Sequence, residues 1–114
     1  HFDAALRLSP RDPLRWVTLI NKGSALRVLG RYDEAIAHCR QACQFPDTGF
    51  LPHMHLAAAL AEAGQKSEAQ AAVENAMQLQ PALSIGFLRS LYVGMHETPL
   101  KSVLDSLRKA GVPE

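Results

Sequence analysis

Small, apolar and polar residues follow a helical spacing along this chain, and the same spacing returns 34 positions later. Aligning Gly30 with Gly64 overlays the chain on itself. A fixed period of this length is typical of helical hairpins that stack into a solenoid. The pairs that match in size or polarity at this offset are Gly23/Ala57, Ala25/Ala59, Leu26/Leu60, Glu34/Glu68, Ala35/Ala69, Cys39/Val73, Ala42/Ala76 and Phe45/Leu79.

The pattern predicts an all-α protein and contains no credible strand. Residues 1–8 are interpreted as the tail of a second helix whose partner is missing, so we expect the chain to be part of a longer protein. The helices that follow are predicted at 13–29, 33–45, 50–63, 67–79, 83–92 and 98–110.

Glycines and capping residues mark where these helices should begin and end. Gly30 and Gly64 are predicted to end the first helix of each hairpin in the left-handed conformation, which glycine adopts readily. Asp33 and Ser67 are predicted to cap the second helix of each hairpin, and Thr98 is predicted to cap the last helix of the chain. All three side chains can accept a hydrogen bond from a free backbone N–H at a helix start.

The last predicted helix is amphipathic. Its apolar stripe is formed by Leu100, Val103, Leu104 and Leu107. Terminal units of repeat proteins need a polar outer face for solubility. We therefore expect this helix to be a solvating cap that covers the preceding helix near Phe87.

The period and the matched positions resemble the tetratricopeptide repeat (TPR), a family of helical hairpins. The resemblance implies an all-α right-handed solenoid with a C-terminal capping helix, and a role in binding other proteins. We predict one TPR domain over residues 1–114. Its parts are the end of a truncated repeat (1–10), a first full repeat (13–46), a second full repeat (48–81) and the C-terminal helices with the cap (82–114).

Phrases around the repeats resemble a narrower group. "LRLSPRDP" (6–13), "GRYDEAI" (30–36), "AEAGQKSEAQAAVENAMQLQPALSI" (61–85) and "LRKAGVPE" (107–114) are similar to the C-terminal TPR region of bacterial class III adenylate/guanylate cyclase-like proteins. Similar TPR tails follow winged-helix regulators. The resemblance implies a regulatory region of a larger bacterial signalling protein, or else a self-association or intramolecular module of a winged-helix transcriptional regulator. It carries no catalytic residue to this chain.

Composition excludes several classes of protein. The 114 residues are 47% hydrophobic with a formal net charge of +1, and no apolar run approaches the roughly 20 residues that span a bilayer. No signal peptide is recognisable. Cys39 and Cys43 are four apart, so one helix places them on the same face, where a disulfide would constrain nothing distant. We interpret them as reduced packing residues of a cytoplasmic protein.

Candidate chemistry is sparse. His38, Cys39 and Cys43 could suggest a metal site, but the usual paired ligand spacings are absent, and packing is the preferred interpretation. His53 and His55 are two apart, so a helix turns them about 200° from each other, and they cannot jointly bind one metal ion. No nucleophile–base signature or phosphate-binding loop is present. We predict no catalytic residue, no metal, no cofactor and no enzymatic activity in this chain.

Nucleic-acid binding is a weaker alternative. Residues 1–40 carry seven basic and four acidic side chains, a balance of +3. The two signs are interleaved, as on an ordinary solvated face. We therefore predict no direct contact with nucleic acid and none with a membrane.

The concave side of a TPR solenoid is lined by the first helix of each hairpin. We predict that this groove binds a protein or peptide segment, for which the same parent protein is one candidate source. The alternative is contact with another domain of the parent or a homo-oligomer, for which an edge around Phe2 and Leu6 is the candidate. The predicted groove residues are Val17, Asn21, Ser24, Arg27, Leu51, Met54, His55, Ala58 and Glu62.

The subtype of TPR domain that clamps a C-terminal carboxylate is not expected here. The resemblance implies that such domains use paired Asn and Lys/Arg residues on successive first helices. Ser24 and Ala58 stand at those two positions.

Overall fold

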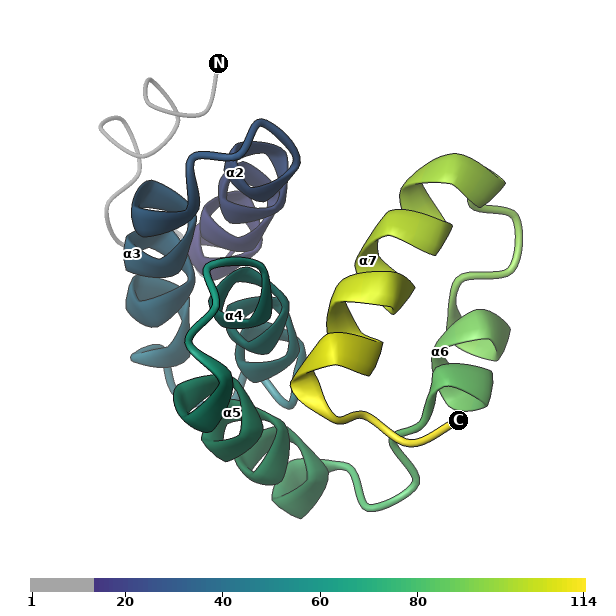
Figure 1. Cartoon of the computed structure of the whole chain (residues 1–114). Helices are drawn as coiled ribbons and strands as arrows, with labels where there is room; N and C mark the ends of the chain where they lie inside the picture. The colour runs from purple at the N-terminus through teal and green to yellow at the C-terminus, as the bar shows by residue number, and fades with distance from the viewer. Residues whose placement is uncertain (1–13) are drawn as a thin grey trace.

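The computed structural model describes residues 14–114, which are helical throughout apart from turns and short connections (Figure 1). The predictions made for residues 1–10, including the edge around Phe2 and Leu6, lie outside the described residues. No strand occurs in the described part, and the all-α prediction is confirmed. The helices are α2 (Arg15–Val28), α3 (Tyr32–Cys43), α4 (Leu51–Glu62), α5 (Lys66–Leu79), α6 (Ile85–Leu91) and α7 (Glu97–Ala110).

The first four of these helices form two consecutive hairpins, α2–α3 and α4–α5, at the predicted offset. α4 packs against α3 as well as α5, so the hairpins stack as in a helical-repeat solenoid (Figure 1). Gly30 and Gly64 end the first helix of each hairpin, both with φ of +80°. This left-handed conformation strains any residue with a Cβ, so the prediction made for both glycines is confirmed.

The hairpins cross closely at small residues. An added Cβ at Gly23 would lie 2.6 Å from Cys39 Sγ on α3. Cys39 is 1% exposed, so its predicted packing role is confirmed. Both cysteines are free. Burial raises the pKa of Cys39 to about 12 and that of Cys43 to about 11, so both remain protonated thiols at neutral pH.

The capping predictions for Asp33, Ser67 and Thr98 are wrong. Each of these residues lies in the first turn, because α3, α5 and α7 begin at Tyr32, Lys66 and Glu97. The residues at the cap positions are Arg31, Gln65 and His96, and none of their side chains forms a capping hydrogen bond. The chain turns into each helix one or two residues earlier than the short polar side chains suggested.

The last helix occupies an unexpected place. In a regular stack a new helix packs chiefly on the second helix of the preceding hairpin, as α4 does on α3, whereas α7 packs chiefly on the first helix, α4. Figure 1 shows α7 (yellow) facing α4, while α6 lies on the outer side of α7. The predicted apolar stripe of α7 is confirmed, since its four residues are at most 6% exposed. α7 is therefore not simply a cover for the helix that contains Phe87.

Candidate functional site

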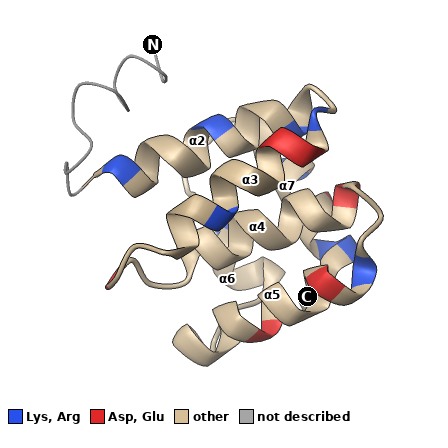
Figure 2. Cartoon of the chain, turned by 90° about the vertical axis from the view of Figure 1, so that its left-hand side faces the viewer, with Lys and Arg blue, Asp and Glu red and all other residues tan. Residues whose placement is uncertain are grey.

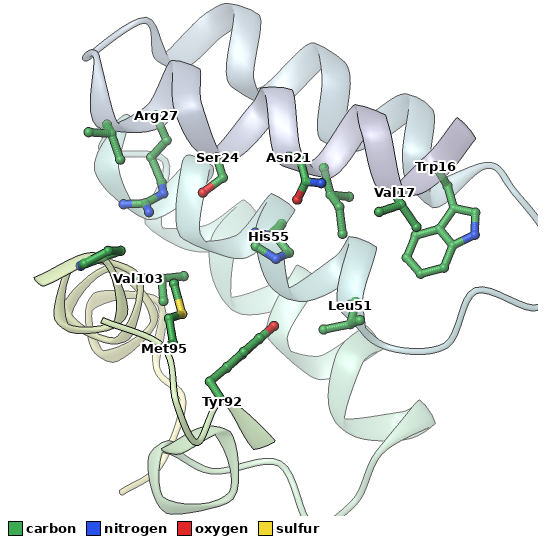
Figure 3. A pocket seen from close by; sticks show the side chains of 13 residues that line it. Trp16, Val17, Asn21, Ser24, Arg27, Leu51, His55, Tyr92, Met95 and Val103 are labelled. Carbon is green, nitrogen blue, oxygen red and sulfur yellow. The ribbon is translucent and has the colours of Figure 1, made fainter. Parts of the chain in front are cut away.

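A groove follows the side of the molecule on which α2, α4 and α7 face one another. The half at the C-terminal end of α4 is occupied by α7, whose Ser106 and Lys109 contact Glu62. The other half contains a cavity of about 330 Å³, bounded by α2, the start of α4 and the segment from Tyr92 to Val103 (Figure 3). Its lining residues are Trp16, Val17, Ile20, Asn21, Ser24, Arg27, Val28, Leu51, His55, Tyr92, Met95, Pro99 and Val103. We call this cavity the groove pocket.

Six of the nine predicted groove residues line the groove pocket, namely Val17, Asn21, Ser24, Arg27, Leu51 and His55. Met54 and Ala58 do not, because they are 1% and 0% exposed and belong to the hydrophobic core. Our expectation that they present a surface to a ligand is wrong, since both lie in the core where α4 packs against its neighbouring helices. Glu62 is engaged by α7. That the groove binds a protein remains a prediction.

Seven lining residues were not predicted. Trp16, Ile20 and Val28 lie on α2, and a wider apolar stripe drawn through Val17 would have included them. The other four come from Tyr92 to Val103 and form the opposite wall. No local pattern could have found them, because their position depends on how α7 docks against α4, and more than 30 residues of chain separate these two helices.

Arg27 joins α2 to α7 at the boundary between the filled and open halves of the groove. Its Nη1 donates to Ser102 Oγ at 3.3 Å and to Ser106 Oγ at 3.0 Å. Ser106 in turn donates to Glu62 Oε2 at 2.6 Å. Lys109 Nζ lies 3.0 Å from Glu62 Oε1. This chain of contacts ties three helices together through side chains that are up to 79 residues apart.

The electrostatics of this cluster follow from burial. Burial of the guanidinium lowers the pKa of Arg27, while the nearby Glu62 carboxylate opposes that shift. The hydrogen bond from Ser106 holds the pKa of Glu62 below its ordinary value, with further help from Lys109. Arginine remains charged in proteins even when its pKa falls, so the cluster contains a buried cation and a carboxylate at neutral pH.

His55 lies in the middle of the groove pocket (Figure 3). Desolvation lowers its pKa to about 4, and the positive charge of Arg27 adds to the effect. The imidazole is therefore neutral at pH 7, with one ring nitrogen as donor and the other as acceptor. His55, Asn21 and Ser24 have no hydrogen-bond partner within residues 14–114, so their polar groups are available to a ligand.

The groove pocket is mostly apolar, and its polar groups include no nucleophile held by a base. Among residues 14–114 no three histidine, cysteine, aspartate or glutamate side chains come together as metal ligands would. In the same region no helix is both long and apolar enough to cross a bilayer.

Comparison with known proteins supports the repeat. Residues 18–45, which contain most of α2 and all of α3, match the family model described as "Tetratricopeptide repeat". No curated protein and no solved structure matches the chain significantly. TPR units generally mediate contacts between proteins and are generally not catalytic. The matched hairpin, repeated 34 residues later in an all-helical stack, supports the assignment of this chain as a TPR protein.

Proposed function

We propose that this domain is a non-catalytic interaction module whose groove pocket takes apolar side chains from a segment of another protein. The observation that carries the proposal is the half-filled groove. One continuous wall, made by α2 and α4, already holds a helix at one end and leaves an apolar cavity at the other. Val28 and Met95 border that cavity and are 66% and 42% exposed.

The size of the groove pocket sets what it can bind. About 330 Å³ is the lower end of the range for ligand-binding pockets, and it admits a few large side chains rather than a whole helix. Burying one large apolar side chain contributes about 1.5–3 kcal/mol. Anchors of this kind, seated in a pocket and surrounded by polar contacts, dominate the energy of many protein interfaces.

The test begins with a probe of defined composition. A phage-displayed library of random 12-residue peptides is selected on the immobilised chain, and enriched peptides are synthesised with a fluorescent label. Fluorescence anisotropy then gives their dissociation constants. We expect binding to weaken by about tenfold or more in Met95→Glu and in Val28→Glu, because each places a charge at the apolar rim.

Leu79→Glu is the matched control. Leu79 is 56% exposed and lies on α5, away from the groove pocket, so the same substitution there should leave binding unchanged. Circular dichroism of each variant checks that the helical content is retained. Failure to enrich any peptide, or equal losses in all three variants, would contradict the proposal.

We also propose a narrower context, that of a cytoplasmic regulatory region within a larger bacterial signalling protein. It is supported by the phrases that resemble the TPR tails of cyclase-like proteins. The competing context, a winged-helix regulator, is supported by the same phrases. Sequencing the gene upstream of the codon for His1 separates them, since a cyclase core and a winged helix have unrelated motifs. If the upstream sequence contains neither a cyclase core nor a winged helix, both contexts are contradicted.

A further inference from the structure

The groove pocket contains a buried positive charge that lacks a counter-ion in contact. Arg27 is the only charged side chain of residues 14–114 that lines it. The residue is 6% exposed, and both of its hydrogen bonds leave from Nη1 toward serine hydroxyls. Its Nε is buried without a partner. No carboxylate within the described part forms an ion pair with it, because Glu62 is held by Ser106 and Lys109 instead.

The unused edge of this guanidinium has a specific shape. Nε and Nη2 point the same way and form a planar fork that matches the two oxygens of a carboxylate. Leaving a buried cation without a counter-charge is unfavourable, so a ligand that brings a carboxylate gains more here than at an exposed arginine. Neutral His55 next to the fork does not supply that charge.

The surroundings favour the same sign of ligand. α2 contains no acidic residue, and Figure 2 shows Lys and Arg (blue) but no Asp or Glu (red) on this helix. No aspartate or glutamate in the described residues lines the groove pocket. Complementary charge of this kind steers partners and selects among them.

The two walls of the groove pocket differ in polarity. Asn21, Ser24 and Arg27 follow one another at intervals of three residues and project from α2, whereas Tyr92 and Met95 face them from the other side (Figure 3). A segment between these walls therefore meets the hydrogen-bonding groups of Asn21, Ser24 and Arg27 among apolar residues on the α2 side, and mainly apolar surface beside the Tyr92 hydroxyl on the other.

We infer that the partner segment is acidic and amphipathic, with an Asp or Glu side chain that pairs with Arg27 and a large apolar residue that fills the space between Leu51, Tyr92 and Met95. This inference rests on the proposed function and specifies its ligand. The carboxylate belongs to an internal side chain and not to a chain terminus.

The same peptide selection provides the test, with each enriched peptide synthesised with an amidated C-terminus. We expect enriched sequences to contain Asp or Glu within one helical turn of a Leu, Met or aromatic residue. Arg27→Met should weaken their binding by about tenfold or more, as expected for a charge-assisted contact. Replacing the acidic residue of the peptide by its amide should weaken binding to the wild-type chain equally, and should change nothing further in Arg27→Met.

Three controls separate the outcomes. Arg31→Met removes a similar charge at an exposed position outside the groove pocket and should have no effect. Arg27→Lys keeps the charge but not the planar fork, so its peptide affinity should lie between that of the wild type and that of Arg27→Met. Ser106→Ala breaks the link to α7 while it keeps Arg27, so a loss as large as that of Arg27→Met would overturn the inference.

The failures are distinguishable. Enriched peptides that depend on Met95 and Val28 but are neutral or basic, or that bind Arg27→Met as well as the wild type, would overturn the acidic partner while leaving the proposed function intact. No enrichment at all would overturn both.

Discussion

α2 and α4 occupy the same place in successive repeats, yet they differ in how much of their surface is buried. In α4 every residue from Leu56 to Leu60 is at most 8% exposed. In α2 burial is confined to one stripe, and Val28 at its end is 66% exposed. The two helices differ because α4 packs against α7 on its groove side, in addition to its contacts with α2, α3 and α5. The first helix with the longer buried run is therefore the one against which α7 packs.

Individual positions show the same contrast. Ser24 and Ala58 are equivalent at the 34-residue offset, but Ser24 faces the groove pocket and Ala58 is 0% exposed beneath its neighbours. The repeat thus keeps its geometry while its groove positions change polarity. The same position is part of an open pocket wall in the first repeat and part of the hydrophobic core in the second.

The largest expected effect tests this contrast directly. Ala58→Glu should lower the free energy of unfolding by about 3 kcal/mol or more, because it buries a charge with no partner. Ser24→Glu should stay within about 0.5 kcal/mol of the wild type, because its side chain reaches the open pocket. Urea unfolding followed by circular dichroism measures both. Equal losses of unfolding free energy in the two variants would contradict the claim that Ser24 and Ala58 lie in different environments.

A smaller effect is expected at the helix crossing. Gly23→Ala should lower the free energy of unfolding by about 1–2 kcal/mol, since the new methyl group overlaps Cys39 Sγ. The equivalent residue in the second hairpin, Ala57, already has a Cβ and lies in the same hydrophobic core as Val73, which stands at the Cys39 position. In a Cys39→Ala background the loss from Gly23→Ala should become smaller. Thermal or urea unfolding of the four proteins gives the coupling, and strictly additive changes would contradict the contact.

The smallest effect sharpens the comparison at Glu62, which connects α4 to α7. Glu62→Gln should reduce stability at pH 7 by about 0.5–1 kcal/mol, since a charged acceptor becomes a neutral one. The hydrogen bond from Ser106 depresses the pKa of Glu62, so its contribution is present above the ordinary glutamate pKa of about 4.3 and is lost as pH falls through the depressed value.

Urea unfolding at pH 7, 5 and 3 measures that dependence. The difference between wild type and Glu62→Gln should be steady from pH 7 to 5 and should narrow at pH 3. A difference that is constant to pH 3, or that grows as the solution becomes more acidic, would contradict the role of the carboxylate.

The sequence predicted the helices well and their caps badly, for different physical reasons. The overlay of Gly30 on Gly64 locates both hairpins because small residues are required wherever the repeat crosses or turns. Asp33, Ser67 and Thr98 fail as caps because they lie in the first turn, where short polar side chains are also tolerated, and these helices begin without a side-chain capping hydrogen bond.

The groove was predicted in part. The repeat register suffices to predict the pocket residues of α2, because they depend only on which side of this helix faces the groove. It does not suffice for Met54 and Ala58, because their burial depends on the docking of α7 across a long stretch of chain. Two signals in the sequence pointed that way: the apolar run of α4, and Ser102 with Ser106 spaced by one turn beside the apolar stripe of α7.

The chain end has a mechanical consequence. Ile85 N–H donates to Pro113 O at 2.8 Å and Gly86 N–H donates to Glu114 O at 3.0 Å, so the final residues are fastened to the start of α6. A pulling force applied at Glu114 is therefore carried first by these two bonds and by the Arg108–Glu114 ion pair, not by the apolar contact between α7 and α4. These contacts are few and partly exposed, so we expect them to break before the packing of α7 on α4 is disturbed.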